Sequence, residues 1–119
     1  MKRKKSQQED APPADLEALL ESSAAAWEEG DFDAALATAE TACEFSPDSA
    51  AAHRCRAAAL LELEELDDAV TAVEQSLKLA PDDPEGMLYA AEFFVGFPDG
   101  DPELRARGAE LARRGAKLA

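Results

Sequence analysis

The sequence predicts an all-α fold of three tandem helix pairs, and three observations support this prediction. Apolar residues recur at helical spacing from Asp15 onward, proline and glycine separate the helical segments, and residues repeat at an interval of 34 positions. The composition agrees, because 46% of the 119 residues are hydrophobic, only 6% are aromatic, and 27 are alanine. Alanine is the strongest helix former, and its small side chain lets helices pack closely.

A tail precedes the helices and covers residues 1–14. It combines a basic run, a polar run and Ala11-Pro12-Pro13, which together carry too little apolar surface to offset the entropy of ordering. Its four cations could touch an anionic surface weakly, but a purely solvating role is the more common one for such a run. We therefore assign the tail no function and start the helical domain at residue 15.

The helices follow in order, each bounded by a start or stop signal. They span about residues 16–29, 32–45, 49–63 and 66–79, and two further helices start near residues 84 and 102. Gly30 suits a helix C-cap, and Asp31 and Asp48 suit N-caps. Asp83-Pro84 and Asp101-Pro102 each place proline at the first helical position, after a capping aspartate. These boundaries define three repeats at about residues 16–49, 50–83 and 84–119.

The 34-residue interval aligns residues that a stacked helix pair would constrain. Pro47 matches Pro81 and Ala35 matches Ala69, while Ser23, Ala57 and Ala91 align with one another. The last three must be small because the second helix of the same pair crosses close by. Each added pair is expected to bury the apolar face that the previous pair left open.

The run from Gly30 to Ala35, Gly-Asp-Phe-Asp-Ala-Ala, followed by Ala42 and Pro47, resembles the tetratricopeptide repeat. The resemblance covers residues 16–119 and implies three antiparallel repeats in a short right-handed solenoid. It is weaker in the second repeat, where Glu64-Glu65 stands in place of a glycine turn. In the third repeat, Gly96-Phe97-Pro98-Asp99-Gly100 lengthens the turn between the helices.

In tetratricopeptide proteins the first helix of each pair lines a concave groove. Carried over position by position, the resemblance places these residues in the groove: Leu20, Ala24, Trp27, Glu28, Arg54, Ala58, Leu61, Glu62, Leu88, Tyr89, Glu92 and Val95. Trp27 and Tyr89 are the residue types that act as binding anchors, and three glutamates beside an apolar strip favour cations. The expected partner is a basic or amphipathic protein segment. A competing interpretation buries Trp27 against Phe32.

Some family members clamp the terminal carboxylate of a chaperone with lysine and asparagine side chains. The matching positions here hold Leu20, Ala24, Cys55, Glu85 and Tyr89, so no such clamp is expected.

The last repeat has no polar capping helix after it in this sequence. We expect its open face, with Leu104, Leu111, Ala112 and Leu118, to be covered by a second copy, by a partner or by further sequence. A homodimer, head-to-tail or symmetric, fits this expectation. The alternative is that the basic side chains of the last helix mask that face. Gly108 and Gly115 predict a weak last helix unless something packs on it.

Charge and motifs narrow the function further. The net charge is −14, but residues 1–8 carry four cations and no acid, residues 9–103 carry 25 acids and three cations, and residues 104–119 carry five cations and one acid. An acidic body repels phosphate backbones, so no nucleic-acid partner is expected. No apolar run reaches the length of a membrane span, and no signal peptide pattern is present, so we expect a cytoplasmic protein.

Catalytic and metal-binding motifs find no support. The single histidine, His53, lies on an alanine-rich helix, and HExxH, GxSxG and phosphate-binding glycine loops do not occur. Cys43, His53 and Cys55 are close in sequence, but His53 and Cys55 are two residues apart and point to different sides of a helix. We expect no enzyme activity, no cofactor and no metal.

The sequence therefore predicts a non-catalytic protein interaction module that binds its partner in the groove and self-associates through the last repeat. Two alternatives stay open at this point. One is a small assembly or secretion chaperone for a client protein, and the other is a regulatory segment of a longer protein with an enzyme domain elsewhere.

Overall fold

The computed structural model describes residues 12–98 and 100–118. In this part of the chain six helices and no strand are present: α2 (Pro12–Glu28), α3 (Phe32–Phe45), α4 (Ala50–Glu62), α5 (Leu66–Leu79), α6 (Pro84–Val95) and α7 (Pro102–Leu118). The predicted all-α fold is confirmed. Helix α2 begins at Pro12, where we expected a tail through residue 14, because proline is well accommodated in the first turn of a helix. The rest of the predicted tail, residues 1–11, lies outside the described residues.

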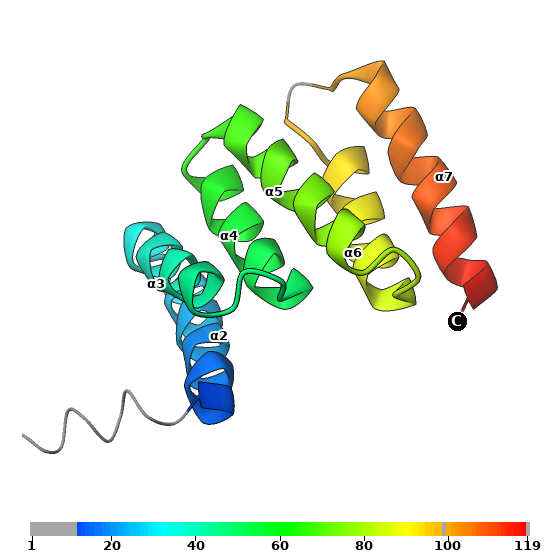
Figure 1. The fold of residues 1–119 in the computed structure, drawn as a ribbon. Helices are drawn as coiled ribbons and strands as arrows, with labels where there is room; N and C mark the ends of the chain where they lie inside the picture. Colours follow the sequence, from blue (N-terminus) through cyan, green and yellow to red (C-terminus); the bar gives the residue numbers. More distant parts are fainter. Residues whose placement is uncertain (1–11, 99, 119) are drawn as a thin grey trace, which may run out of the picture.

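The helices pack as three consecutive pairs, α2 with α3, α4 with α5, and α6 with α7 (Figure 1). Helix α3 also packs against α4, and α2 touches α4, so the first two pairs form a continuous stack. The molecule is elongated, with principal extents of 56 × 29 × 20 Å. Each pair thus contacts its neighbour in the chain, as a repeat architecture requires.

Side-chain caps start three of the described helices, α3, α6 and α7, at the predicted residues Asp31, Asp83 and Asp101. The Ala34 amide donates to Asp31 Oδ1 at 3.2 Å, and the Glu103 amide donates to Asp101 Oδ1 at 2.8 Å. The prediction that Asp48 caps α4 is wrong. Ser49 takes this role, with its hydroxyl oxygen accepting from the Ala52 amide at 3.1 Å, because its backbone is still extended while the next residue is helical.

The helices within a pair approach closely at small residues. Ser23, Ala57 and Ala91 are 2%, 0% and 5% exposed, and Ala35 and Ala69 are fully buried. The Ser23 hydroxyl donates to the Ala35 carbonyl at 2.9 Å, which satisfies this buried polar group within the contact. The predicted small-residue crossings are confirmed.

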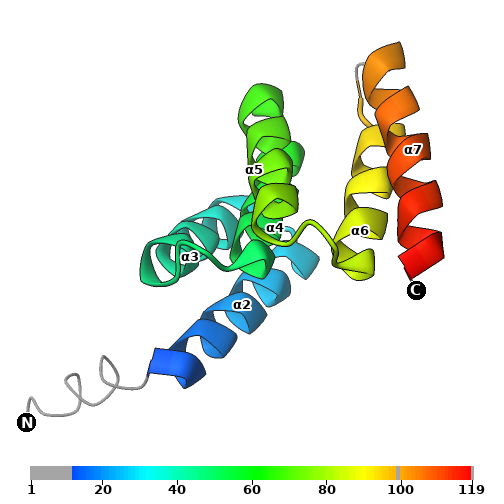
Figure 2. The ribbon, with the colours of Figure 1, turned by 45° about the vertical axis from the view of Figure 1, so that its right-hand side comes forward.

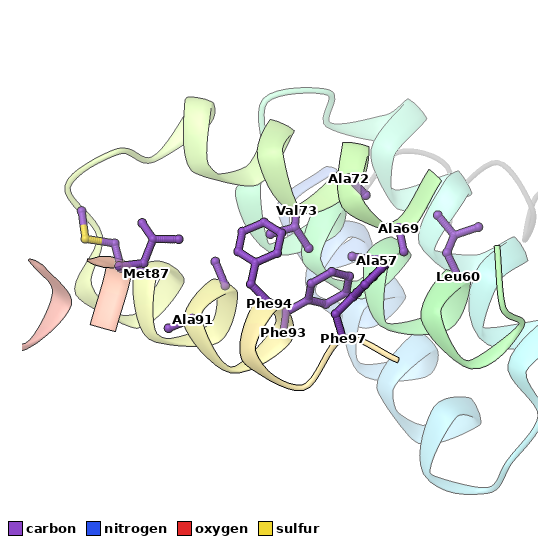
Figure 3. Close-up of a cluster of buried hydrophobic side chains, with 12 residues drawn as sticks. Ala57, Leu60, Ala69, Ala72, Val73, Met87, Ala91, Phe93, Phe94 and Phe97 are labelled. Carbon is purple, nitrogen blue, oxygen red and sulfur yellow. The ribbon is translucent and has the colours of Figure 1, made fainter. Parts of the chain in front are cut away.

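The junction between the second and third pairs is built differently. Helices α5 and α6 make few backbone contacts, and the third pair stands apart from the stack of the first two (Figure 2). Phe93, Phe94 and Phe97 fill this junction together with Val73 and Leu60 (Figure 3). Large aromatic side chains hold the helix axes further apart than alanine does, so the junction is wide but still buried.

Helix α7 is fixed to the rest of the molecule at two kinds of contact. Gly108 and Gly115 are buried against α6, so the glycines allow the close packing on which the stability of this helix depends. Arg107 forms two hydrogen bonds to the Glu74 carboxylate of α5, at 2.7 and 3.1 Å, and its guanidinium carbon lies 5.6 Å from the Phe94 ring centre. The last helix is therefore attached to both α6 and α5.

Candidate functional site

A pocket of about 200 Å³ opens between α2 and α4. Ser23, Ala24, Trp27 and Glu28 of α2 and Cys55 and Ala58 of α4 line it. Ala24 and Ala58 are small, so they leave the space, while Trp27 forms a wall of the pocket. The pocket follows from the repeat itself, because the first helices of two consecutive pairs lie next to each other here.

Trp27 is held in place at both ends of its ring system. Its Nε1 donates to the Ala58 carbonyl at 3.3 Å, and its rings meet Phe32 edge-on at a centre distance of 6.2 Å and an angle of 63°. The side chain is nevertheless 39% exposed. Both interpretations of Trp27 are therefore right in part, since it contacts Phe32 and also presents a fixed apolar surface to solvent.

The pocket carries one acid and otherwise neutral groups. Burial raises the pKa of the Cys55 thiol more than the nearby Arg54 lowers it, so Cys55 is a neutral thiol near neutral pH. Ser23 is turned into the pair and bonds to Ala35. Glu28 is exposed and supplies negative charge at the edge of the pocket.

Tyr89 and Arg54 connect α6 to α4 beside this pocket. The Tyr89 hydroxyl donates to the Arg54 carbonyl at 3.3 Å, and burial raises the pKa of Tyr89 to about 12. Arg54 Nη1 lies 3.8 Å from Asp83 Oδ2, and a side chain at Gly86 would press on the same nitrogen. Arg54 Nη1 is buried without a hydrogen bond among the described residues, so the guanidinium acts here through its ion pair and packing rather than toward the pocket.

A second hollow, of about 600 Å³, lies where α4 turns into α5. Leu61, Glu62, Glu64 and Leu66 line it together with Pro98 from the loop after α6. It shares no lining residue with the pocket between α2 and α4, which we call the Trp27 pocket. The predicted groove residues of the second repeat are thus divided between the two hollows.

The twelve predicted groove residues do not form one continuous surface. Ala24, Trp27, Glu28 and Ala58 share the Trp27 pocket, Leu61 and Glu62 line the other hollow, and Arg54 and Tyr89 meet between α4 and α6; Leu20 is half-buried, and Leu88, Glu92 and Val95 are exposed. Sequence reasoning missed Ser23 and Cys55 as pocket residues. Cys55 lies one helical turn before Ala58, so the helical spacing was a signal that could have found it.

The face predicted for self-association is mostly unavailable in this structure. Leu111 is only 2% exposed, and Leu104 and Ala112 pack against the same core. The prediction is wrong for Leu111, because the close approach of α7 to α6 turns this side chain inward. Leu118 alone of the four is largely accessible, at 48%.

Cys43 and His53 lie next to each other between α3 and α4. His53 Nε2 donates to the Pro47 carbonyl at 3.0 Å, and His53 Nδ1 lies 3.8 Å from Cys43 Sγ. Burial raises the pKa of Cys43, so this thiol is protonated near neutral pH. Across the described ranges, no three histidine, cysteine or acidic side chains come together as metal ligands do.

Within the same ranges, none of the helices has the length and apolarity that crossing a bilayer requires.

Paired helices that repeat every 34 residues and stack along one direction define a helical repeat protein. The model of the tetratricopeptide repeat family matches residues 7–50 and residues 20–84. The chain belongs to the tetratricopeptide repeat family, whose repeats generally mediate protein–protein interactions and whose members are typically non-catalytic scaffolds. A search among curated proteins found no match to the chain.

Proposed function

We propose that the chain binds a protein segment by taking one large apolar side chain of that segment into the Trp27 pocket, with a neighbouring cation of the segment beside Glu28. The fixed, 39% exposed ring system of Trp27 next to a small-walled hollow is the observation that supports this proposal most strongly. Tryptophan at the edge of a pocket is a typical energetic centre of protein interfaces.

The size of the pocket favours a side chain over a free small molecule. Small-molecule sites usually enclose about 300–1,000 Å³, whereas this pocket encloses about 200 Å³. Its lining is mostly apolar, with two alanines, Trp27 and the neutral Cys55 thiol beside Ser23 and Glu28, and it suits an aliphatic or aromatic side chain. The rest of the segment would then run along the exposed surfaces of α2 and α4.

The charge around the pocket favours a basic segment. Helix α2 carries four acidic residues and no cation over residues 12–28, and Glu28 is one of the pocket residues. On α4 the nearest cation, Arg54, is already paired with Asp83. An acidic surface beside an apolar pocket steers cationic partners toward it and disfavours anionic ones.

Selection from a random peptide library displayed on phage tests this proposal, because the library samples many candidate segments at once. We expect the native chain to enrich peptides that carry a leucine, isoleucine or phenylalanine next to lysine or arginine. The Ala58→Arg variant, which fills the pocket and reverses its charge, should enrich none of them. Ala37→Arg, which adds the same side chain at an exposed position of α3, serves as the matched control and should enrich the same peptides as the native chain.

Enrichment of acidic peptides, or an equal result for Ala58→Arg and Ala37→Arg, would contradict the proposal.

A second assay distinguishes the proposed adaptor from the chaperone alternative. A chaperone would hold an unfolded client at a fixed stoichiometry and suppress its aggregation, whereas an adaptor that binds only a short segment would leave aggregation of an unrelated unfolded protein unchanged.

A further inference from the structure

In each of the first two repeats, one residue of the first helix contacts the first helix of the next repeat or the residue that caps it. Trp27 donates to the Ala58 carbonyl of α4, and Arg54 lies against Asp83 and Gly86 at the start of α6. These positions therefore lie on the side of a repeat against which the next repeat packs. The 34-residue register identifies the same side in the third repeat.

That side is open in the third repeat. Val95 lies two registers after Trp27, and Leu88 lies one register after Arg54. They are 51% and 41% exposed, and both belong to the face of α6 that packs over the glycines of α7. Two large apolar side chains of the third repeat are thus exposed, whereas the residues at the equivalent positions of the first two repeats contact the next repeat.

The opposite end of the molecule has the complementary open side. In α4 a stripe at helical spacing turns toward the preceding pair: Arg56 on this stripe lies 3.8 Å from Glu40 of α3, and Ala52 and Ala59 on the same stripe are fully buried. One register earlier, the corresponding residues of α2 are Ala18 and Ala25, and both are exposed. Small residues that are buried between repeats are therefore left uncovered on α2.

The charges of the two ends are opposite. Helix α2 holds four acidic residues and no cation, while α7 holds five cations and two acids. Arg114 and Lys117 of α7 are exposed. An α2 helix placed against the end formed by α6 and α7 would meet opposite charge, whereas α7 against a second α7 would meet like charge.

We propose that copies of this chain stack head to tail, with α2 of one copy seated on the open side of α6 and α7 of the next. The contact reproduces between molecules the junction that α4 makes with the first repeat inside each molecule. The occupant is a second copy because the chain carries both halves of that junction, one at each end. Such a contact is heterologous, so it extends to short oligomers rather than stopping at a symmetric dimer.

Two end-blocking variants test the stacking by sedimentation velocity over a range of concentrations. Val95→Glu places an acid where acidic α2 would arrive, and Ala25→Arg places a bulky cation on α2 where basic α7 would lie. Both positions are exposed in the single chain, so circular dichroism should show unchanged helix content. The exposed Ala37→Arg is the matched control.

We expect the native chain and Ala37→Arg to increase in average mass with concentration, and less so at high salt, where the charges of the two ends are screened. Each end-blocked variant alone should stay monomeric. An equal mixture of the two should form a one-to-one dimer and nothing larger, because one open side of each kind remains. The salt dependence should survive in this mixed dimer.

Two results would overturn the proposal. One is a native chain that stays monomeric at every concentration. The other is a dimer formed by Ala25→Arg alone, which would mean that the two copies meet through the same end.

Discussion

Gly30 and Glu64 occupy equivalent positions in two turns, 34 residues apart, and both have a positive φ, 84° for Gly30 and 64° for Glu64. The two turns therefore share the same backbone conformation, although one has glycine and the other has glutamate at this position. A side chain in this left-handed region costs roughly 1–2 kcal/mol relative to the right-handed one, and glycine avoids the cost. The second turn keeps its shape because the helices on both sides of it are fixed by packing.

We predict that Glu64→Gly raises the free energy of unfolding by about 1 kcal/mol, since the relief of strain exceeds the added entropy of the unfolded chain. Urea denaturation followed by circular dichroism measures this change. Gly30→Ala is the reciprocal variant: nothing lies within 4 Å of the added carbon, so its expected loss of stability comes from the backbone alone. A destabilised Glu64→Gly chain would contradict the interpretation of the turn.

Tyr89 gives a second prediction at this scale. The pKa of its buried hydroxyl is raised to about 12, above the ordinary value of 10, so the neutral form is favoured in the folded state. Stability is unaffected below pH 10 and falls as the pH rises from 10 through 12, because the unfolded chain ionises first. Tyr89 is the single tyrosine.

Phenolate absorbance therefore reports Tyr89 alone. We expect its midpoint near pH 12 in the folded protein and near 10 in denaturant. The loss of stability attributable to Tyr89 should disappear in Tyr89→Phe. A folded midpoint near 10 would mean that the hydroxyl is not buried between α4 and α6.

At the scale of elements, the contact between α6 and α7 depends on two glycines, and the space around Gly108 is tighter than the space around Gly115. A side chain at Gly108 would lie 2.8 Å from Val95 Cγ2 and 2.9 Å from the Ala91 carbonyl oxygen. At Gly115 the nearest atoms belong to the Leu88 and Met87 side chains, all at 3.3 Å. Backbone cannot move aside as a flexible side chain can, so the two positions should respond differently.

We predict that Gly108→Ala lowers the free energy of unfolding by about 1–2 kcal/mol, because overpacking exceeds the gain in helix propensity of about 1 kcal/mol. Gly115→Ala should be nearly neutral or stabilising, since the same gain is opposed only by side-chain contacts at 3.3 Å, longer than those at Gly108. Thermal unfolding of the two variants side by side provides the comparison. A stabilised Gly108→Ala chain would show that α6 and α7 are not packed this closely.

The elements also show what sequence alone can and cannot predict. The starts at Asp31 and Asp83 were predictable, because each depends on one residue's local chemistry. The small crossings at Ser23 and Ala57 were predictable because the 34-residue interval aligns them. The burial of Leu111 was not, since it depends on how far α7 turns after a lengthened loop.

The candidate site was predictable only in part for a similar reason. The family resemblance identified Ala24, Trp27, Glu28 and Ala58. It did not show that the groove divides into separate hollows. One hollow lies between α2 and α4, and the other lies where α4 turns into α5 beside Pro98, a residue whose position depends on how the third pair packs against the second.

At the scale of the whole molecule, the arrangement of charge and the arrangement of repeats act together. An acidic first helix, a pocket at the first junction and a basic last helix lie in order along a 56 Å body. The two ends would engage copies of the chain, and the pocket would engage a different protein. Both interactions draw on the acidic residues of α2, but Ala58 lines the pocket and Ala25 does not, so Ala58→Arg and Ala25→Arg separate the two interactions.

The central claim is that the Trp27 pocket takes an apolar side chain from a basic segment. Trp27 is the single tryptophan, so its fluorescence reports the pocket directly. The measurement is a titration of the chain with two synthetic peptides of equal length, each with one central phenylalanine, flanked by lysines in one peptide and by glutamates in the other. We predict a saturable change in Trp27 emission with the lysine peptide, weakened by salt, and none with the glutamate peptide. An equal response to both peptides, or none to either, would contradict the claim.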